Sequence, residues 1–428
     1  MSNDNPWAPR TPESHLARTY PTGAPAQRSR EPRSSTLRDA AAVLAVLVAA
    51  SPASATPQFA RAVDRSCTAC HVLPPKLNDA GRAFVANGYR WIEPATDPSQ
   101  VPGEATVDGV TPTDTVPFAA WLTTRYEDRG GGGPSDVFLP KVELISGGAI
   151  GASLSYFAEW RVVSLSLNGD GSLLDRGGRF EDLLLRWDAS DRHSLRLGQF
   201  RSLNQVDVSL RLSASEPLLF RGNLATERSP DPRLDSLYRF SPSNRSPAVE
   251  YAFRSRSGPG AADGLFHMLA VPFAGELSIP LSDEASEAAS FELAGPKGVY
   301  AETFFRRGER SLGAHAFYHD DAWLVTALGT WRAGDLFLTA GVGLDDGAAA
   351  ERRTRSSLEG EYLLLERDRL RAMAGLRLEE VSNDGTRIAY IPYLALAGPN
   401  RRHTYLLQIE YLDREGADVL VVDLSAIF

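Results

Sequence analysis

The chain has 428 residues, of which 43% are hydrophobic and 23% are charged, and its net charge is −9 at pH 7. No stretch of about 18 uncharged apolar residues appears, which argues against membrane-spanning helices. The negative net charge provides no basic surface for nucleic acid, so that class of function is excluded. Only two residues are cysteines.

The first 55 residues have the pattern of a secretion signal. Four arginines between positions 28 and 38 precede an apolar run at 40–50, and Ala53-Ser54-Ala55 follows it. A basic region, an apolar core and an A-x-A cleavage site make up a signal peptide. We therefore expect export, with residues 1–55 removed.

Residues 56–96 contain the motif that indicates chemistry. Cys67 and Cys70 are three positions apart and His71 follows at once, the C-x-x-C-H pattern of covalent haem c attachment. Each thiol would add to one haem vinyl group, and His71 would be the proximal ligand to iron. One helical turn over 67–71 would place Cys67 and His71 on the same side of the porphyrin.

A short helix is predicted after the motif. Leu77, Ala80 and Phe84 recur at helical spacing, and Asn87-Gly88 is a typical helix end. This apolar stripe could cover a haem edge.

Zinc and a redox disulfide are the alternatives to haem. Zinc would need two further ligands, and the chain has no other cysteine. A redox disulfide has no need of a histidine at the next position. Between residues 56 and 116 there is no methionine and no second histidine. A sixth iron ligand would therefore be Lys76, Asn78, water or a residue from farther along the chain.

Residues 97–115 form a predicted linker rich in Pro, Thr and Asp, and 116–428 repeat a simple pattern. About ten residues alternate between apolar and polar side chains, and a turn follows. A period of two indicates β-strands with one apolar face and one polar, solvated face. The last segment is typical, because Leu420, Val422, Leu424, Ala426 and Phe428 share a face opposite Asp423 and Ser425.

Such strands suit a soluble β-sandwich or a membrane β-barrel, and three features favour the barrel. The polar faces carry many charges, which suits a water-filled lumen. Trp323 and Trp331 share an apolar face and lie ~26 Å apart along an extended strand, which suits two interfacial aromatic girdles. The chain ends on an aromatic residue, Phe428, which resembles the terminal signature of bacterial outer-membrane barrels.

The pattern predicts an all-β transmembrane antiparallel barrel of about 16 strands, including strands at 136–146 and 356–366. An eighteen-strand barrel is the alternative, because the connection at 202–245 is long enough for a further hairpin. Long connections fall on one side and short turns on the other, as in outer-membrane barrels. The small α-helical haem segment would lodge in the lumen and take a distal ligand from the inward-facing Met373 or His315.

The motif region followed by a barrel of about three hundred residues resembles the fused outer-membrane monohaem c-type cytochrome–porin family of iron-oxidising bacteria. The residues that carry the resemblance are Phe59-Ala60, Cys67, Cys70, His71, Leu77-Asn78, Gly81-Arg82, Phe84 and Gly88-Tyr89. The resemblance implies one covalent haem c held by Cys67 and Cys70 with His71 as proximal ligand. It also implies electron transfer from extracellular Fe(II) to a periplasmic c-type cytochrome or another soluble carrier.

Two other functions remain open. One is a transport porin in which the haem segment is a plug or a redox sensor, and the other is a conduit for a different electron donor or acceptor. Outer-membrane lipid is an expected partner in each case. Carboxylates suit Fe(II) as hard oxygen ligands, and an acidic cluster in the predicted external connection 275–296 comprises Asp283, Glu284, Glu287 and Glu292.

Overall fold

The computed structural model describes residues 58–62, 65–91, 118–130, 133–167, 171–175, 177–201, 212, 224–225, 239–240, 245–256, 262–273, 298–319, 322–347, 350–367, 370–382, 386–399, 404–414 and 417–427. The predicted signal peptide, the predicted linker, the four acidic residues of 275–296 and Phe428 lie outside these ranges.

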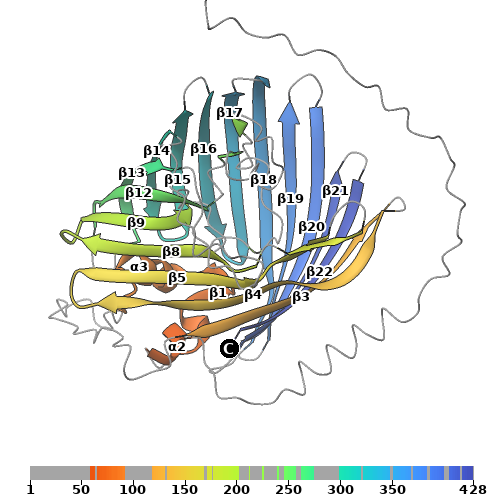
Figure 1. Cartoon of the computed structure of the whole chain (residues 1–428), viewed down its shortest axis with the longest axis horizontal. Coiled ribbons are helices and arrows are strands. Elements are labelled where there is room, and N and C mark those ends of the chain that lie inside the picture. Colours follow the sequence, from red (N-terminus) through yellow and green to blue (C-terminus); the bar gives the residue numbers. More distant parts are fainter. Residues whose placement is uncertain are drawn as a thin grey trace, which may run out of the picture.

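Sixteen antiparallel strands close into one barrel (Figure 1). They are β3 (Ala119–Arg129), β4 (Ser135–Ile150), β5 (Leu154–Val163), β8 (Arg179–Asp188), β9 (His193–Arg201), β12 (Arg245–Arg254), β13 (Gly264–Pro272), β14 (Val299–Arg307), β15 (Arg310–His319), β16 (Ala322–Ala333), β17 (Leu336–Gly347), β18 (Ala350–Arg367), β19 (Leu370–Ser382), β20 (Thr386–Pro399), β21 (Thr404–Arg414) and β22 (Ala417–Ile427). The last strand closes the barrel by pairing with β3, from Ile427 opposite Trp121 to Val419 opposite Arg129.

The predicted count of sixteen is confirmed, and the eighteen-strand alternative is wrong. The connection between β9 and β12 does contain a short hairpin, β10 (Leu224–Ala225) with β11 (Arg239–Phe240), but it forms a separate two-stranded sheet. A second small hairpin, β6 (Leu165–Leu167) with β7 (Leu173–Asp175), lies between β5 and β8 and is also separate from the barrel.

Side chains alternate between the two faces of each strand, as the sequence pattern predicts. On β14, Tyr300, Glu302 and Phe304 are buried, whereas Val299 and Phe305 are exposed. The outward faces carry the large exposed apolar side chains of the barrel, among them Leu197, Leu312, Tyr318, Val342 and Tyr362. An apolar outer surface on a closed barrel suits contact with lipid, because closure leaves no unpaired strand edge.

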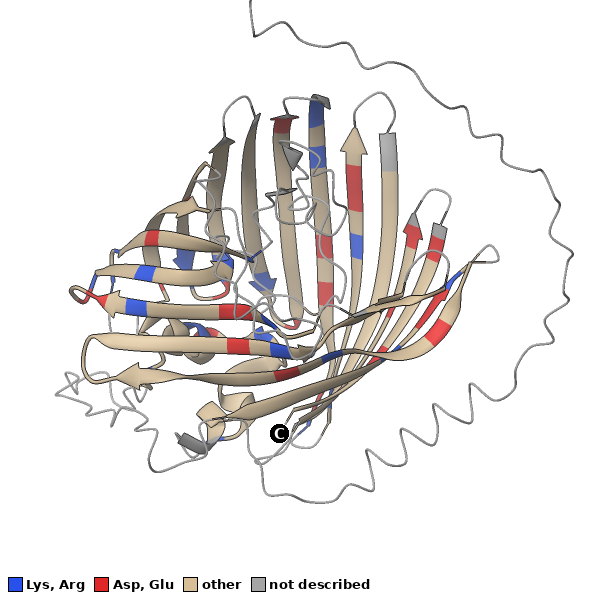
Figure 2. Ribbon diagram, viewed as in Figure 1, with Lys and Arg blue, Asp and Glu red and all other residues tan. Residues whose placement is uncertain are grey.

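Charged residues occupy positions on many of the barrel strands (Figure 2). Those on the inward faces pair across neighbouring strands. Arg125 pairs with Asp423 at 2.7 Å, Arg196 with Glu250 at 2.6 Å, and Arg355 with Asp345 at 2.8 Å. Buried charges are tolerated when they are paired and hydrogen-bonded. The inner wall is therefore lined by paired charges together with buried apolar side chains such as Tyr300 and Phe304.

The connections differ in length at the two ends of the barrel. The three long connections, which follow β5, β9 and β13, all leave the barrel at one end, where short connections also follow β15, β17, β19 and β21. The other end has only shorter connections, among them those after β4, β8, β14, β16 and β18. Short turns face the periplasm in bacterial barrels. Together with the even strand number and the apolar outer surface, this pattern places the chain in a bacterial outer membrane.

The N-terminal segment, residues 58–91, lies against the inner side of the barrel wall near the short turns (Figure 1). Its elements are α2 (Gln58–Ala62), the 3-10 turn η1 (Cys67–Ala69), β1 (His71–Leu73), β2 (Lys76–Leu77) and α3 (Asp79–Ala86). None of the helices among the described residues has the length and apolarity needed to cross a membrane.

Candidate haem-attachment site

The C-x-x-C-H motif forms a tight turn rather than one continuous helix. Cys67 begins the turn η1, and the backbone N–H of Cys70 donates to the carbonyl of Cys67 over 3.2 Å. His71 lies beyond the turn and begins β1. The expectation of a helical turn reaching from Cys67 to His71 is therefore corrected, because the chain becomes extended at His71 and pairs with Leu77 of β2.

Asn78 and Gly81 fix the predicted helix against this turn. The Asn78 side chain caps α3 by accepting from the N–H of Gly81 at 3.0 Å, and it donates to the carbonyl of Ala69, also at 3.0 Å. A β-carbon added at Gly81 would lie 2.2 Å from the Cys70 carbonyl oxygen. Only glycine fits between helix and motif, which gives a physical reason for two residues that carry the family resemblance.

The helix ends where the sequence predicts. Asn87 caps the C-terminus of α3, and Gly88 follows with a φ of +67°. Glycine is favoured at this position because it adopts the left-handed conformation without a steric penalty. Leu77 and Phe84 of the predicted apolar stripe are buried.

His71 is oriented by its own turn. Its Nδ1 lies 3.0 Å from the carbonyl oxygen of Pro75. A carbonyl can only accept, so Nδ1 carries the proton and the lone pair of the neutral ring is on Nε2. Burial lowers the pKa of His71 to about 4. The imidazole is thus neutral at physiological pH and is held in the tautomer that a metal ligand requires.

The Cys67 thiol lies at the inner surface of the barrel. Cys67 and Cys70 are not joined by a disulfide. Burial raises the pKa of Cys67, and burial together with the neighbouring Cys67 raises that of Cys70 to about 11. The hydroxyl of Thr404, at the start of β21, donates to the sulfur of Cys67 over 3.2 Å. Two thiols and one oriented imidazole fit the donor set of a covalent haem c.

The zinc alternative finds no support in the arrangement of ligands. Within the described ranges, no three or more His, Cys, Asp or Glu side chains are grouped so that they could hold a metal ion.

Arginines of the barrel donate hydrogen bonds to backbone carbonyls of the N-terminal segment. Arg371 on β19 donates to the carbonyls of His71 at 3.0 Å and Val72 at 2.6 Å. Arg186 on β8 donates to the carbonyls of Val85 at 3.0 Å and Ala86 at 2.7 Å. These last two carbonyls belong to the C-terminal turn of α3, where cations are favoured.

Three basic residues of the segment pair with acids at separate points of the barrel wall. Lys76 pairs with Glu361 on β18, Arg82 pairs with Glu309 in the β14–β15 turn at 2.7 Å, and Arg90 pairs with Asp188 on β8 at 3.0 Å. The segment is therefore fastened around the mouth of the barrel rather than along one side.

Aromatic rings add an apolar contact between segment and barrel. Phe59 stacks on Tyr89 at 5.3 Å, and Tyr89 stacks on Phe157 of β5 at 5.6 Å. Phe84 meets Phe59 edge to face at 5.1 Å. Such pairs add to the free energy gained by burying apolar area. They join α2, α3 and the barrel wall into one packed unit.

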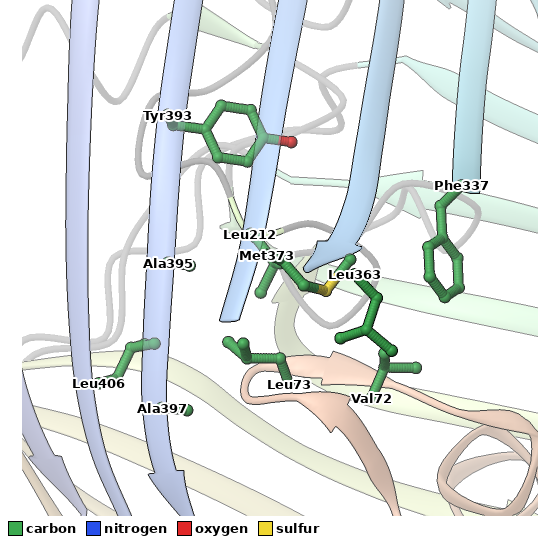
Figure 3. Close-up of a cluster of buried hydrophobic side chains, with 10 residues drawn as sticks. All are labelled: Val72, Leu73, Leu212, Phe337, Leu363, Met373, Tyr393, Ala395, Ala397 and Leu406. Carbon is green, nitrogen blue, oxygen red and sulfur yellow. The ribbon is translucent and has the colours of Figure 1, made fainter. Parts of the chain in front are cut away.

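The two predicted distal ligands both face inward, as expected, but they have different surroundings. Met373 is fully buried in an apolar cluster with Val72 and Leu73, the two residues that follow His71 (Figure 3). His315 is also buried, and its ring lies 5.8 Å from that of Tyr300 on the barrel wall. The structure thus brings Met373 to the strand that begins with His71.

The other two side chains considered as a sixth ligand are already engaged. Lys76 pairs with Glu361, and its ammonium lies 4.5 Å from the centre of the Phe337 ring. Asn78 donates to the carbonyls of Thr68 and Ala69, which lie between the two cysteines, and accepts from the N–H of Gly81 in α3. Sequence reasoning missed Thr404, Arg371, Arg186 and Glu361, since each is a single polar residue of a barrel strand with no local motif.

No protein-family model matches this chain, and no curated protein sequence matches it. Solved structures with a similar shape include an anion-selective porin from Comamonas acidovorans, 12% identical over 72% of this chain and 98% of that chain, with a TM-score of 0.48. Another is the outer-membrane channel DcaP of Acinetobacter baumannii, 12% identical over 73% and 96%, with a TM-score of 0.43.

Proposed function

We propose that the chain is an outer-membrane monohaem cytochrome c whose barrel holds the haem segment at its periplasmic mouth. Cys67 and Cys70 would attach the haem and His71 would be the proximal ligand. The observation that carries the proposal is the His71 ring, whose Nδ1 bonds the Pro75 carbonyl and which directly follows a pair of free cysteines in the sequence. The backbone of this motif is in turn held by Arg371 of the barrel.

A bound haem c would supply one-electron transfer. The chain's own residues would do the rest. Arg371 and Thr404 hold the motif against the inner wall, while Val72, Leu73 and Met373 form an apolar cluster that excludes water next to it. A segment of ~40 residues has too little core to enclose a haem alone, so the barrel would supply the missing walls.

The substrate that we propose is extracellular Fe(II), with a periplasmic c-type cytochrome or another soluble carrier as the acceptor. Support comes from the resemblance of residues 59–89 to the cytochrome–porins of iron-oxidising bacteria. The chemistry is consistent, because Fe(III) precipitates at neutral pH and is best formed outside the cell. Only the electron would then need to cross the membrane.

The test is to reconstitute the haem-loaded protein in liposomes, add Fe(II) outside and follow the haem absorbance by stopped flow. Rapid reduction at a rate that saturates with iron is expected, and the Cys67→Ser/Cys70→Ser variant should give no signal. Reduction by dithionite but not by Fe(II) would reject iron as the donor and favour a conduit for another donor or acceptor.

A second candidate is a transport porin in which the haem segment is a plug or redox sensor. The sixteen-strand barrel with its charged inner wall favours it. The two candidates differ in conductance across planar bilayers. A transport porin should pass ions in steps, whereas a barrel closed by the segment should not.

A further inference from the structure

Tyr393 on β20 lies within hydrogen-bond distance of two carboxyl groups on β18. Its hydroxyl oxygen is 2.8 Å from Oε1 of Glu359 and 2.9 Å from Oε1 of Glu361. All three side chains are buried, with 6%, 5% and 3% of their surface exposed for Tyr393, Glu359 and Glu361.

A glycine on the strand between them makes this contact possible. Gly375 of β19 lies opposite both Glu361 and Tyr393 in the strand register. A β-carbon at Gly375 would lie 2.1 Å from Cζ of the Tyr393 ring. The phenol therefore reaches across β19 only because position 375 has no side chain, and an aromatic ring laid over a strand glycine is a stabilising arrangement.

The two short contacts of the Tyr393 hydroxyl need more protons than the phenol supplies if both glutamates are ionised. A phenol has one proton and can donate to one acceptor, and an ionised carboxylate can only accept. With both glutamates ionised, the single phenolic proton would have to serve both short oxygen–oxygen contacts, so at least one of them would lack a full hydrogen bond. A second proton, on either carboxyl group, makes both contacts hydrogen bonds.

The charged side chains around Glu359, Tyr393 and Glu361 are consistent with a second proton. Lys76 of the N-terminal segment pairs with Oε2 of Glu361, and Arg377 of β19 lies 3.7 Å from Glu359. Two further buried carboxyl groups approach from neighbouring strands, Glu379 on β19 and Glu410 on β21, opposite Tyr393. A proton held among these groups reduces the negative charge buried in the wall.

We propose that Glu359, Tyr393 and Glu361 form a proton-binding site. The hydrogen bonds of these three side chains would carry one exchangeable proton between the barrel lumen and the N-terminal segment at Lys76. The proton is shared over the three oxygens, so the donors and acceptors of these hydrogen bonds reverse when it moves from one carboxyl group to the other. The site is built from contacts between barrel and segment and does not depend on the haem.

The experiment is infrared difference spectroscopy of the full protein in H2O and D2O at neutral pH. The wild type should show the C=O band of a protonated carboxyl group that shifts on deuteration. Glu359→Gln and Glu361→Gln should each abolish it, because a Gln amide donates to the phenol without an extra proton. Glu366→Gln, which removes an exposed carboxylate of the same strand, should leave the band unchanged.

Tyr393→Phe provides a measurement that does not require loss of a carboxyl group. Here the band should move, because the phenol oxygen no longer contacts the protonated group. Circular dichroism confirms that each variant keeps its strands. The absence of a deuterium-sensitive band in the wild type would overturn the proposal. A band that survives in either Gln variant or does not move in Tyr393→Phe would overturn it too.

Discussion

The ammonium of Lys76, five residues after His71, forms a buried ion pair with Glu361 of the barrel, 285 positions away. Removing one partner of a buried pair leaves the other charge uncompensated, which costs about 3–5 kcal/mol. We expect Lys76→Met to lower the free energy of unfolding in urea by about this amount. Arg307→Met, which removes an exposed arginine at the same end of the barrel, is the control and should have little effect.

The double variant Lys76→Met/Glu361→Leu separates the ion pair from general damage. Replacing both charges by apolar side chains removes the uncompensated carboxylate, so stability should recover relative to Lys76→Met alone. A double variant that is less stable than the single one would show that the pair is not the cause.

Gly81→Ala tests the contact between helix α3 and the motif. The added methyl group would meet the Cys70 carbonyl oxygen at 2.2 Å, and overpacking of this kind costs about 1–3 kcal/mol. Less covalent haem per polypeptide is expected from the haem absorbance of the purified protein. Gly329→Ala on β16, where a β-carbon finds ordinary contacts of 3.4 Å and more, should load normally. Equal loading of the two variants would contradict the prediction.

The pH dependence of the haem-free chain follows from His71. Its pKa falls from 6.5 to about 4 in the folded protein because of burial, so the unfolded chain binds more protons between these values. Stability is therefore fully present above pH 6.5 and is lost as the pH falls toward 4. In the Cys67→Ser/Cys70→Ser background, urea midpoints should decline over this range. Adding His71→Asn should flatten the curve, and an unchanged slope would reject this assignment.

The distal ligand can be tested by absorption spectroscopy of the haem-loaded protein. Met373 packs with the two residues that follow His71, so we expect Met373→Leu to change the haem spectrum and His315→Ala to leave it unchanged. The opposite result would make His315 the ligand. An unchanged haem spectrum in both variants would exclude both residues as the distal ligand.

Period-two alternation, together with the turns between segments, predicts the sixteen barrel strands, because one face of each strand meets lipid and the other faces the lumen. The ends of strands were less predictable. The predicted strand at 356–366 extends over Ala350–Arg367, since Arg353 and Arg355 continue the pairing by contacting Asp345. The predicted strand at 136–146 likewise reaches Ile150. Charged and glycine-rich strand ends carry no apolar alternation to reveal them.

The candidate site likewise has local features that the sequence predicts and long-range contacts that it does not. The motif and the helix after it are local, so Cys67, Cys70, His71 and the end of α3 could be read from spacing. Contacts such as Thr404 with Cys67 join residues 337 positions apart. They depend on barrel closure and on where the segment lies, and no local pattern contains that information.

Covalent attachment of haem to the motif can be measured by intact mass spectrometry of the denatured protein. The protein should be purified from the outer membrane of a host that matures c-type cytochromes. We expect the mass of the mature chain plus one haem, with the haem retained after acid extraction and absent from the Cys67→Ser/Cys70→Ser variant. The mass of the polypeptide alone, with two thiols or one disulfide, would contradict it.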